Sequence, residues 1–200
     1  MTSITGSPRS VVVISGSPSP TSKTAKVGEY AVEWLAEMGT EAQHIRVRDF
    51  SPAALLTGDL TDTALKAAVD AVAAADGIIL ATPTFKASFS GLLKAFLDVL
   101  PQYGLRDKTV LPVGTGGSMA HVLSLDYGLR PVVQSMRPKL IVPSVYLIDQ
   151  DLKVENDRFF IEARSRDLFV EMLEEFEMAL HNVSMRPERA PREQLLHAVG

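Results

Sequence analysis

The stretch that decides the fold reads VVVISGSPSPTSKT and spans residues 11–24. It opens with four consecutive β-branched residues, Val11 to Ile14, and such a run predicts a strand that is buried on both faces. The residues that follow are rich in Gly, Pro, Ser and Thr, which predicts a loop. From Ala25 to Met38 apolar residues return at helical spacing, so an amphipathic helix should follow the loop.

This loop has the composition of an anion site. The start of a helix attracts negative charge through its free backbone N–H groups and its dipole, and Ser22 or a neighbour is expected to cap the helix. Lys23 adds a positive charge. Four hydroxyl groups accompany it, from Ser17, Thr21, Ser22 and Thr24. An ordinary capped turn between a strand and a helix is the alternative interpretation.

Two common phosphate motifs do not occur in the loop. A P-loop requires a Gly directly before its Lys, but Ser22 precedes Lys23. The dinucleotide fingerprint requires three closely spaced Gly, whereas Gly28 is the next Gly after Gly16. The loop therefore favours a monophosphate held by hydroxyl groups over a triphosphate or a pyrophosphate.

Composition limits the classes of function. A chain of 200 residues fits one domain with a sizeable core. Its 20 basic and 24 acidic residues give a net charge of −4, which does not favour nucleic acid or an anionic membrane as a partner. Without Cys there is no disulfide, thiolate chemistry or Cys-ligated metal. No long apolar segment or signal-peptide pattern is evident, so we expect a soluble, cytoplasmic protein.

Strands and helices alternate along the whole chain. Further strands are expected at 41–47, 77–81, 108–113 and 140–147, and further helices at 61–73, 90–100, 119–136 and 164–181. This alternation predicts an α/β, flavodoxin-like fold, with a five-stranded parallel sheet in the order 2-1-3-4-5 and helices on both faces. We expect a single domain over residues 1–181. Residues 182–200 mix Pro, Arg and Glu in a way typical of a disordered tail.

Two more loops should meet the first at the carboxyl edge of this sheet. The loop Thr82-Pro83-Thr84-Phe85-Lys86 combines an aromatic ring, a positive charge and free N–H groups, which suits the edge of a flat heteroaromatic ring. In the loop Thr115-Gly116-Gly117-Ser118, the two Gly would let the backbone approach a ligand closely. The alternatives are that Phe85 and the nearby Phe89 belong to the core while Lys86 is only solvated, and that the Gly pair only forms a tight turn.

The sequence offers no evident catalytic side chain or metal site. His121 is a lone His early in an expected helix, a position more typical of a structural role. His44, His181 and His197 lack metal-ligand spacing. Ser17 is not part of the Gly-x-Ser-x-Gly motif of a nucleophilic serine. A bound cofactor would then carry the chemistry, as in flavin enzymes.

Taken together, these segments resemble the NAD(P)H-dependent FMN reductase family. The resemblance is strongest to the reductase component of two-component alkanesulfonate monooxygenase systems. It covers roughly residues 11–181 and rests on segments 16–24, 82–87, 90–98, 115–121 and 126–131. Two positions depart from the family pattern, since Ser19 stands where many members carry Arg and Phe85 where many carry Tyr.

The resemblance implies the cofactors and the role of each loop. It implies hydride transfer from NADPH or NADH to the N5 atom of FMN, with no catalytic side chain of the protein, and release of reduced FMN to a flavin-dependent monooxygenase. It places the FMN phosphate at Ser17, Ser22, Lys23 and Thr24. It places the flavin ring against Pro83, Thr84, Phe85, Lys86, Thr115, Gly116 and Gly117. The nicotinamide preference stays open.

The same resemblance implies a homo-oligomer, and a tetramer more than a dimer. The expected helix 90–100 supports this, because it carries apolar residues on more than one face. Gly128 and Pro131 interrupt the next helix, so we expect a π-type bulge that places Tyr127 at a subunit interface. A simple kink with Tyr127 on the surface is the alternative.

Two other functions compete with a flavin reductase. A quinone or azo-dye reductase would keep FMN bound and reduce a second organic substrate. An electron carrier of the flavodoxin type would need no nicotinamide site, but such carriers usually have a strongly acidic surface, which a net charge of −4 does not give.

Overall fold

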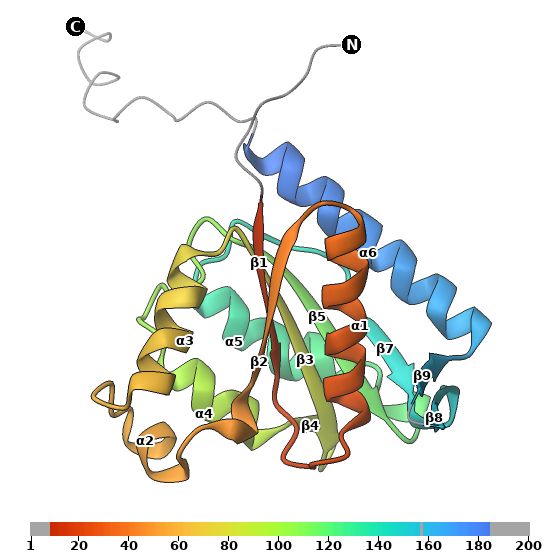
Figure 1. Ribbon diagram of the computed structural model, residues 1–200, viewed down its shortest axis with the longest axis horizontal. Helices are drawn as coiled ribbons and strands as arrows, with labels where there is room; N and C mark the ends of the chain where they lie inside the picture. Colours follow the sequence, from red (N-terminus) through yellow and green to blue (C-terminus); the bar gives the residue numbers. More distant parts are fainter. Residues whose placement is uncertain (1–8, 157, 185–200) are drawn as a thin grey trace, which may run out of the picture.

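A computed structural model describes residues 9–156 and 158–184, and its centre is a mostly parallel sheet with helices on both sides (Figure 1). Its strands run in the order β2-β1-β3-β5-β6, with β7 also paired to β5, so the predicted fold and order 2-1-3-4-5 are confirmed. The parallel strands are β1 (Ser10–Ser15), β2 (Glu41–Arg46), β3 (Gly77–Phe85), β5 (Thr109–Gly116), β6 (Leu140–Ile141) and β7 (Val145–Ile148).

The sheet has more than the five strands predicted. The expected fifth strand is divided into β6 and β7, and Pro143 lies between them. Because Pro has no N–H group to donate to the neighbouring strand, it interrupts the pairing with β5. The short strand β4 (Ser88–Phe89) pairs antiparallel with the end of β3 and brings the sheet to seven strands.

Helices cover each face of the sheet and enclose one core cluster on each side. On one face lie α1 (Lys23–Glu37) and α6 (Ala163–Ser184). The other face is covered by α2 (Pro52–Thr57), α3 (Thr63–Ala74), α4 (Gly91–Val99) and α5 (Arg130–Ser135). Within β1 the side chains alternate between the two clusters. Val11 and Val13 belong to the cluster beneath α1 and α6, and Val12 and Ile14 belong to the cluster beneath α2 to α5. This double burial explains the run of four β-branched residues.

The segment predicted as one helix over 119–136 has three parts. A 3₁₀ turn (η2, Met119–His121) precedes a π-helix (η3, Leu125–Leu129), which continues into α5. The π-helix contains Tyr127, so the predicted irregularity is confirmed. Arg130 secures it by donating to Asp126 at 3.0 Å and to the carbonyl oxygen of Val142 at 3.2 Å.

Further elements were not predicted. They include α2, the 3₁₀ turns η1 (Val47–Asp49) and η4 (Asp149–Asp151), and a hairpin of β8 (Leu152–Glu155) and β9 (Arg158–Ile161). The helix α6 runs to Ser184 and so occupies the first residues of the predicted tail; the rest, 185–200, lies outside the described residues. Among the described residues no helix is both long and apolar enough to cross a bilayer.

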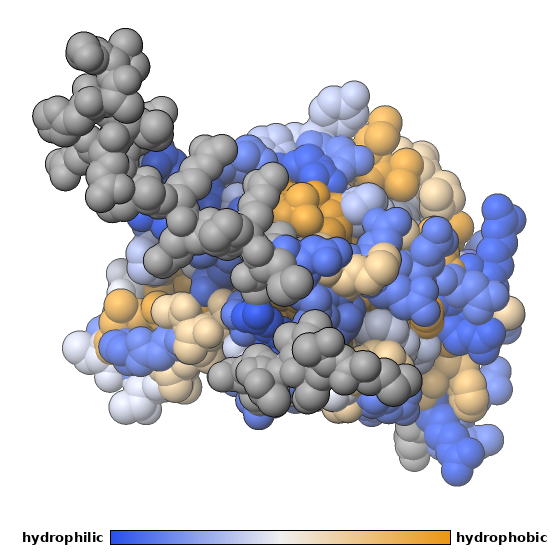
Figure 2. All heavy atoms as spheres, turned by 90° about the horizontal axis from the view of Figure 1, so that it is seen from above, coloured by the Kyte–Doolittle hydropathy of each residue, from blue (hydrophilic) through white to orange (hydrophobic). Residues whose placement is uncertain are grey.

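The two ends of the sheet differ in character. At the end where α6 finishes, polar and apolar residues are interspersed over the part of the surface that is not covered by grey atoms (Figure 2). The loops that follow β1, β3 and β5 lie at the opposite end, at the bottom of Figure 1. As the sequence predicts, the three loops rich in Gly, Ser and Thr meet there.

His44 on β2 makes stability depend on pH. Its Nε2 atom lies 2.9 Å from the Ser15 hydroxyl, and its Nδ1 atom is buried without a partner among the described residues. Burial and the nearby charge of Arg46 lower the pKa of His44 from 6.5 to about 4. The folded protein therefore binds fewer protons than the unfolded chain between these values, so stability is full above about pH 6.5 and falls towards pH 4.

We expect this loss to be about 1–2 kcal/mol, after a discount for the partial exposure of the ring. Chemical denaturation of the wild type and of His44→Gln between pH 4 and 7 measures it, since the amide keeps a hydrogen bond to Ser15 without titrating. The difference in unfolding free energy between the two proteins should change across this range. A difference that stays constant with pH would contradict the prediction.

Candidate functional site

The carboxyl ends of β1, β3 and β5 surround a cavity of about 200 Å³. Ten of the eleven predicted site residues line it, and Lys86 does not. The lining residues are Ser17, Ser19, Thr21, Ser22, Lys23, Thr24, Pro83, Thr84, Phe85, Thr115, Gly116, Gly117 and Asp149. The structure thus brings together three loops that are far apart in the sequence, because parallel strands end at one edge.

The loop after β1 is fixed by its own hydroxyl groups. Ser22 caps α1, and its side chain accepts a hydrogen bond from the Ala25 N–H at 3.0 Å. Ser17, Ser22 and Thr24 are buried. Thr24 also lies 2.6 Å from the Thr115 hydroxyl, which connects the start of α1 to the end of β5. The loop is therefore held in place by contacts within the protein.

Lys23 lies at the cavity but already has a partner. Its Nζ atom donates to the carbonyl oxygen of Asp149 at 2.7 Å, which connects the first loop to η4. An ammonium group has three N–H donors, so two remain for a ligand. Arg48, in the 3₁₀ turn η1 (Val47–Asp49), approaches the same loop and lies 3.5 Å from the Ser19 carbonyl oxygen.

The predicted loop 82–86 is mostly strand, because β3 continues to Phe85 and turns back into β4. Lys86 and Ala87 form the turn, and both have positive φ, 52° and 59°. A two-residue turn of this kind usually contains Asn or Gly, so Lys and Ala are strained here. Phe85 is 50% exposed beside the cavity, whereas Lys86 lies at the tip of the hairpin.

The end of β5 is in contact with Tyr146 of β7. A Cβ atom on Gly116 would lie 2.1 Å from the Tyr146 hydroxyl oxygen, and one on Gly114 would lie 2.7 Å from its ring. That hydroxyl donates to Thr84 at 3.0 Å. Gly116 is therefore required by a side chain of the protein, while a Cβ atom on Gly117 would meet open space.

Ser90 at the start of α4 forms hydrogen bonds to the loop after β1 and to β3. Ser90 donates its hydroxyl hydrogen to the Gly16 carbonyl oxygen at 2.5 Å, and it caps α4 by accepting from Leu93. The Ser90 N–H donates to Thr82 at 2.9 Å. The hydrogen bonds of this one residue reach the ends of β1 and β3, which fixes their separation.

Several residues at the site were missed or left undecided by the sequence. Ser19 and Thr21 line the cavity within a loop that was already singled out. Asp149 was missed, although its place just after the last parallel strand puts it at the same edge. His121 is exposed on η2 and does not line the cavity. No group of three or more His, Asp or Glu within the described part of the chain could hold a metal ion.

Comparisons with known proteins agree on one family. A family model described as NADPH-dependent FMN reductase matches residues 9–153. An FMN reductase (NADPH) of Escherichia coli (strain K12) is 36% identical over 171 residues, which cover 86% of this chain and 90% of that protein. An FMN reductase (NADPH) of Pseudomonas putida is 40% identical over 142 residues, which cover 71% and 72%.

A solved structure gives the same result at the level of the fold. The apo form of an NADH:FMN oxidoreductase is similar with a TM-score of 0.81 and 45% sequence identity, covering 94% of this chain and 98% of that one. The names of these similar proteins differ in the nicotinamide nucleotide, NADPH for the two FMN reductases and NADH for the solved structure.

Proposed function

The chain belongs to the NADPH-dependent FMN reductase family and is an NAD(P)H:FMN oxidoreductase, and from this premise we propose that FMN binds in the cavity at the carboxyl ends of β1, β3 and β5. The observation that carries the proposal is the meeting of the hydroxyl-rich loop with the ends of β3 and β5 in one cavity. Family membership also disfavours the flavodoxin-type electron carrier.

The first loop fits the phosphate of FMN. It offers the hydroxyls of Ser17, Ser22 and Thr24 and the remaining N–H donors of Lys23, at the start of a helix of 15 residues. Ser19 occupies the position where many family members carry Arg, and Arg48 brings a guanidinium group to the same loop. We propose that Arg48 supplies the positive charge that Ser19 does not.

The ends of β3 and β5 fit the flavin ring. Pro83, Thr84 and Phe85 form one wall, while Thr115, Gly116 and Gly117 form the other. Lys86 at the tip of the hairpin would face the rim of the ring. When bound, FMN supplies a ring that accepts a hydride from NAD(P)H.

The protein orients the reaction and takes no covalent part in it. A cavity of about 200 Å³ is smaller than a typical pocket for a whole nucleotide, so we propose that bound FMN stays partly exposed and can meet the nicotinamide there. We propose no catalytic side chain, because the described residues of this cavity include no His or Cys and only one carboxylate, Asp149. Positioning then accounts for the rate acceleration.

Absorbance at 340 nm of purified protein with NADPH or NADH tests the activity, with and without added FMN. Oxidation that depends on catalytic amounts of protein and continues until FMN or nucleotide is exhausted is the expected result. Oxidation that requires an added quinone or azo dye would favour the rival reductase instead. No oxidation of either nucleotide under any of these conditions would contradict the proposal.

The phosphate assignment predicts a preference for FMN over riboflavin, which lacks the phosphate. Each charge-assisted hydrogen bond contributes about 1.5–3 kcal/mol, so FMN should bind at least about tenfold more tightly. Lys23→Ala should weaken FMN binding and leave riboflavin binding nearly unchanged. Quenching of flavin fluorescence measures all four affinities, and equal affinity of the wild type for the two flavins would refute the assignment.

We further propose that reduced FMN is released in the cytoplasm to a flavin-dependent monooxygenase.

We also propose that the chain forms a homo-oligomer, and a tetramer more than a dimer. Tyr127 is 79% exposed and Leu123 54% exposed, both on or beside the π-helix, which suits a subunit contact. Light scattering at micromolar concentration measures the assembly. A monomeric mass, or an unchanged mass and flavin retention in Tyr127→Ala, would contradict the role given to this surface.

A further inference from the structure

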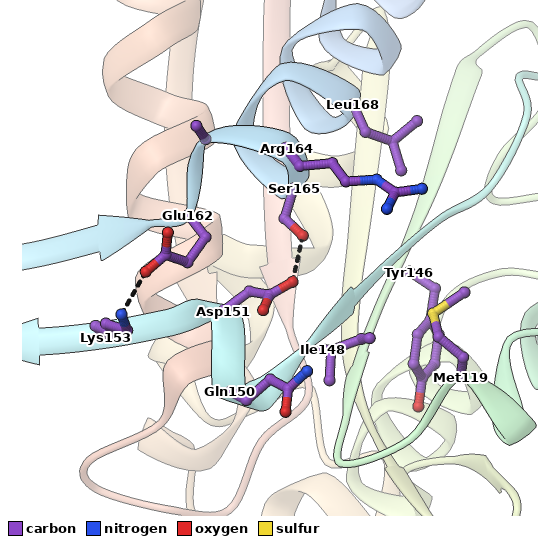
Figure 3. A pocket seen from close by; sticks show the side chains of 11 residues that line it. Met119, Tyr146, Ile148, Gln150, Asp151, Lys153, Glu162, Arg164, Ser165 and Leu168 are labelled. Carbon is purple, nitrogen blue, oxygen red and sulfur yellow. Dashed lines mark hydrogen bonds and ion pairs between the residues drawn. The ribbon is translucent and has the colours of Figure 1, made fainter.

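A second and larger cavity, of about 910 Å³, adjoins the one described above. It lies between the end of β7, the turn η4 and the start of α6 (Figure 3). Asp149 lines the smaller cavity, whereas its neighbours Ile148 and Gln150 line the larger one. The two cavities therefore border the same short segment, residues 148–150.

Most charged groups of this larger cavity are already paired, and Arg164 is the charged group among the described lining residues that is not. Lys153 forms an ion pair with Glu162, and Asp151 accepts a hydrogen bond from Ser165 at 2.6 Å. Arg164 makes no hydrogen bond or ion pair within residues 9–156 and 158–184. Figure 3 shows its side chain running past Leu168 towards the side of the cavity where Ile148 and Tyr146 lie.

In this arrangement the two carboxylates lie away from the apolar surface, and the unpaired cation lies beside it. The guanidinium group of Arg164 faces a side of the cavity that carries Met119, Ile148 and Leu168. The two carboxylates, Asp151 and Glu162, lie with their partners on the other side. A planar guanidinium presents several N–H donors in a fork that matches a phosphate group. An apolar wall beside it suits a purine base.

We propose that this cavity binds the phosphate-bearing part of the nicotinamide nucleotide, with Arg164 in contact with a phosphate group. The inference rests on the proposed function, which places FMN in the smaller cavity and requires the nicotinamide to lie over its ring. The remainder of such an elongated, anionic substrate must extend beyond that ring. The larger cavity is the adjoining space, and it offers an unpaired cation and an apolar wall.

Arg164→Ala and Arg164→Glu test the contact, with Arg166→Ala as the matched control. Arg166 lies on the same helix, is exposed, pairs with Asp167 at 3.0 Å and does not line the cavity. Initial rates at saturating FMN give KM and kcat for NADPH and for NADH. We expect KM to rise about tenfold in Arg164→Ala and further in Arg164→Glu, with kcat little changed, because the contact is the same before and during hydride transfer.

The two nucleotides identify the phosphate that Arg164 contacts. A rise in KM for NADPH alone indicates the 2′-phosphate, and an equal rise for both indicates the pyrophosphate. Calorimetry with 2′,5′-ADP and with ADP on the FMN-loaded protein provides a second measure that does not depend on turnover. In either case Arg166→Ala should match the wild type, and the affinity for FMN should be the same in all four proteins.

The inference and the proposed function fail in different ways. If the wild type reduces FMN but the Arg164 variants keep its KM values and its affinities for both adenosine phosphates, the inference is overturned and the proposed function stands. If the wild type oxidises neither nucleotide, the proposed function fails. Absence of calorimetric binding of either adenosine phosphate to the wild type would then overturn the inference as well.

Discussion

Gly116→Ala is expected to destabilise the protein by about 1–3 kcal/mol and to weaken FMN binding at least about tenfold. The added Cβ atom would lie 2.1 Å from the hydroxyl oxygen of Tyr146, which is too close for two non-bonded atoms, so one of them must move. Tyr146 is only 5% exposed and donates to Thr84, so it cannot move aside without breaking that hydrogen bond. Thr84 belongs to the wall proposed for the flavin ring, which connects the clash to binding.

A second substitution tests whether the clash with the Tyr146 hydroxyl, and not the loss of glycine as such, causes the destabilisation. In Gly116→Ala with Tyr146→Phe, the clashing oxygen is gone and the nearest ring atom lies at 3.2 Å, a tight but tolerable distance. The double variant should therefore recover a large part of the stability, so that the two substitutions are not additive. Urea denaturation of the four proteins measures the coupling. Gly117→Ala is the control, because its Cβ atom meets open space.

Additive effects of the two substitutions would contradict the explanation. So would a loss of stability in Gly117→Ala as large as that in Gly116→Ala. Flavin titration of the same proteins adds an independent test, since the double variant regains the position of β5 but lacks the Tyr146 hydroxyl that holds Thr84. We therefore expect its affinity for FMN to recover less than its stability does.

The sequence was sufficient for the order of the sheet because local patterns are strong there. The buried run Val11 to Ile14, the hydroxyl-rich loop and the helix after it all point to the same arrangement, and alternation with later strands supplies the rest. The meeting of three loops then follows from parallel topology alone. The eleven site residues were assigned through the family resemblance, and the parallel topology explains why ten of them line one cavity.

What the sequence did not reveal depends on contacts between distant segments. Thr115-Gly116 was taken for a loop because Gly is rare in strands, yet it is the end of β5, and Gly116 makes room for Tyr146 from another strand. The turn at Lys86 and Ala87 lacks the usual Asn or Gly, so its hairpin gives no local signal. The strands of the β8–β9 hairpin are only four residues long, too short for a clear periodic pattern, and only the fold shows that its start borders the second cavity.

Gly16→Ala is expected to have an even larger effect on stability than Gly116→Ala. Its Cβ atom would lie 2.4 Å from the Cβ atom of Leu93 and 3.0 Å from its Cα atom. No truncation of Leu93 to another chiral residue removes these atoms, so the backbone of α4 must shift away from β1. Leu93 is fully buried, and Ser90 at the start of the same helix donates to the Gly16 carbonyl oxygen. The shift therefore disturbs the core and the hydrogen bond together.

We expect a loss at or above the upper end of the range for overpacked cores, about 3 kcal/mol. Gly91→Ala is the matched control on the same helix, because its Cβ atom meets no atom within 4 Å and Ala favours the helix. Urea denaturation should show Gly91→Ala as stable as the wild type or more so. Leu93→Ala, which keeps the clashing Cβ atom, should fail to rescue Gly16→Ala, in contrast to the rescue of Gly116→Ala by Tyr146→Phe. Recovery of stability with Leu93→Ala would show that side-chain crowding, and not the backbone approach of α4 to β1, sets the requirement for glycine at position 16.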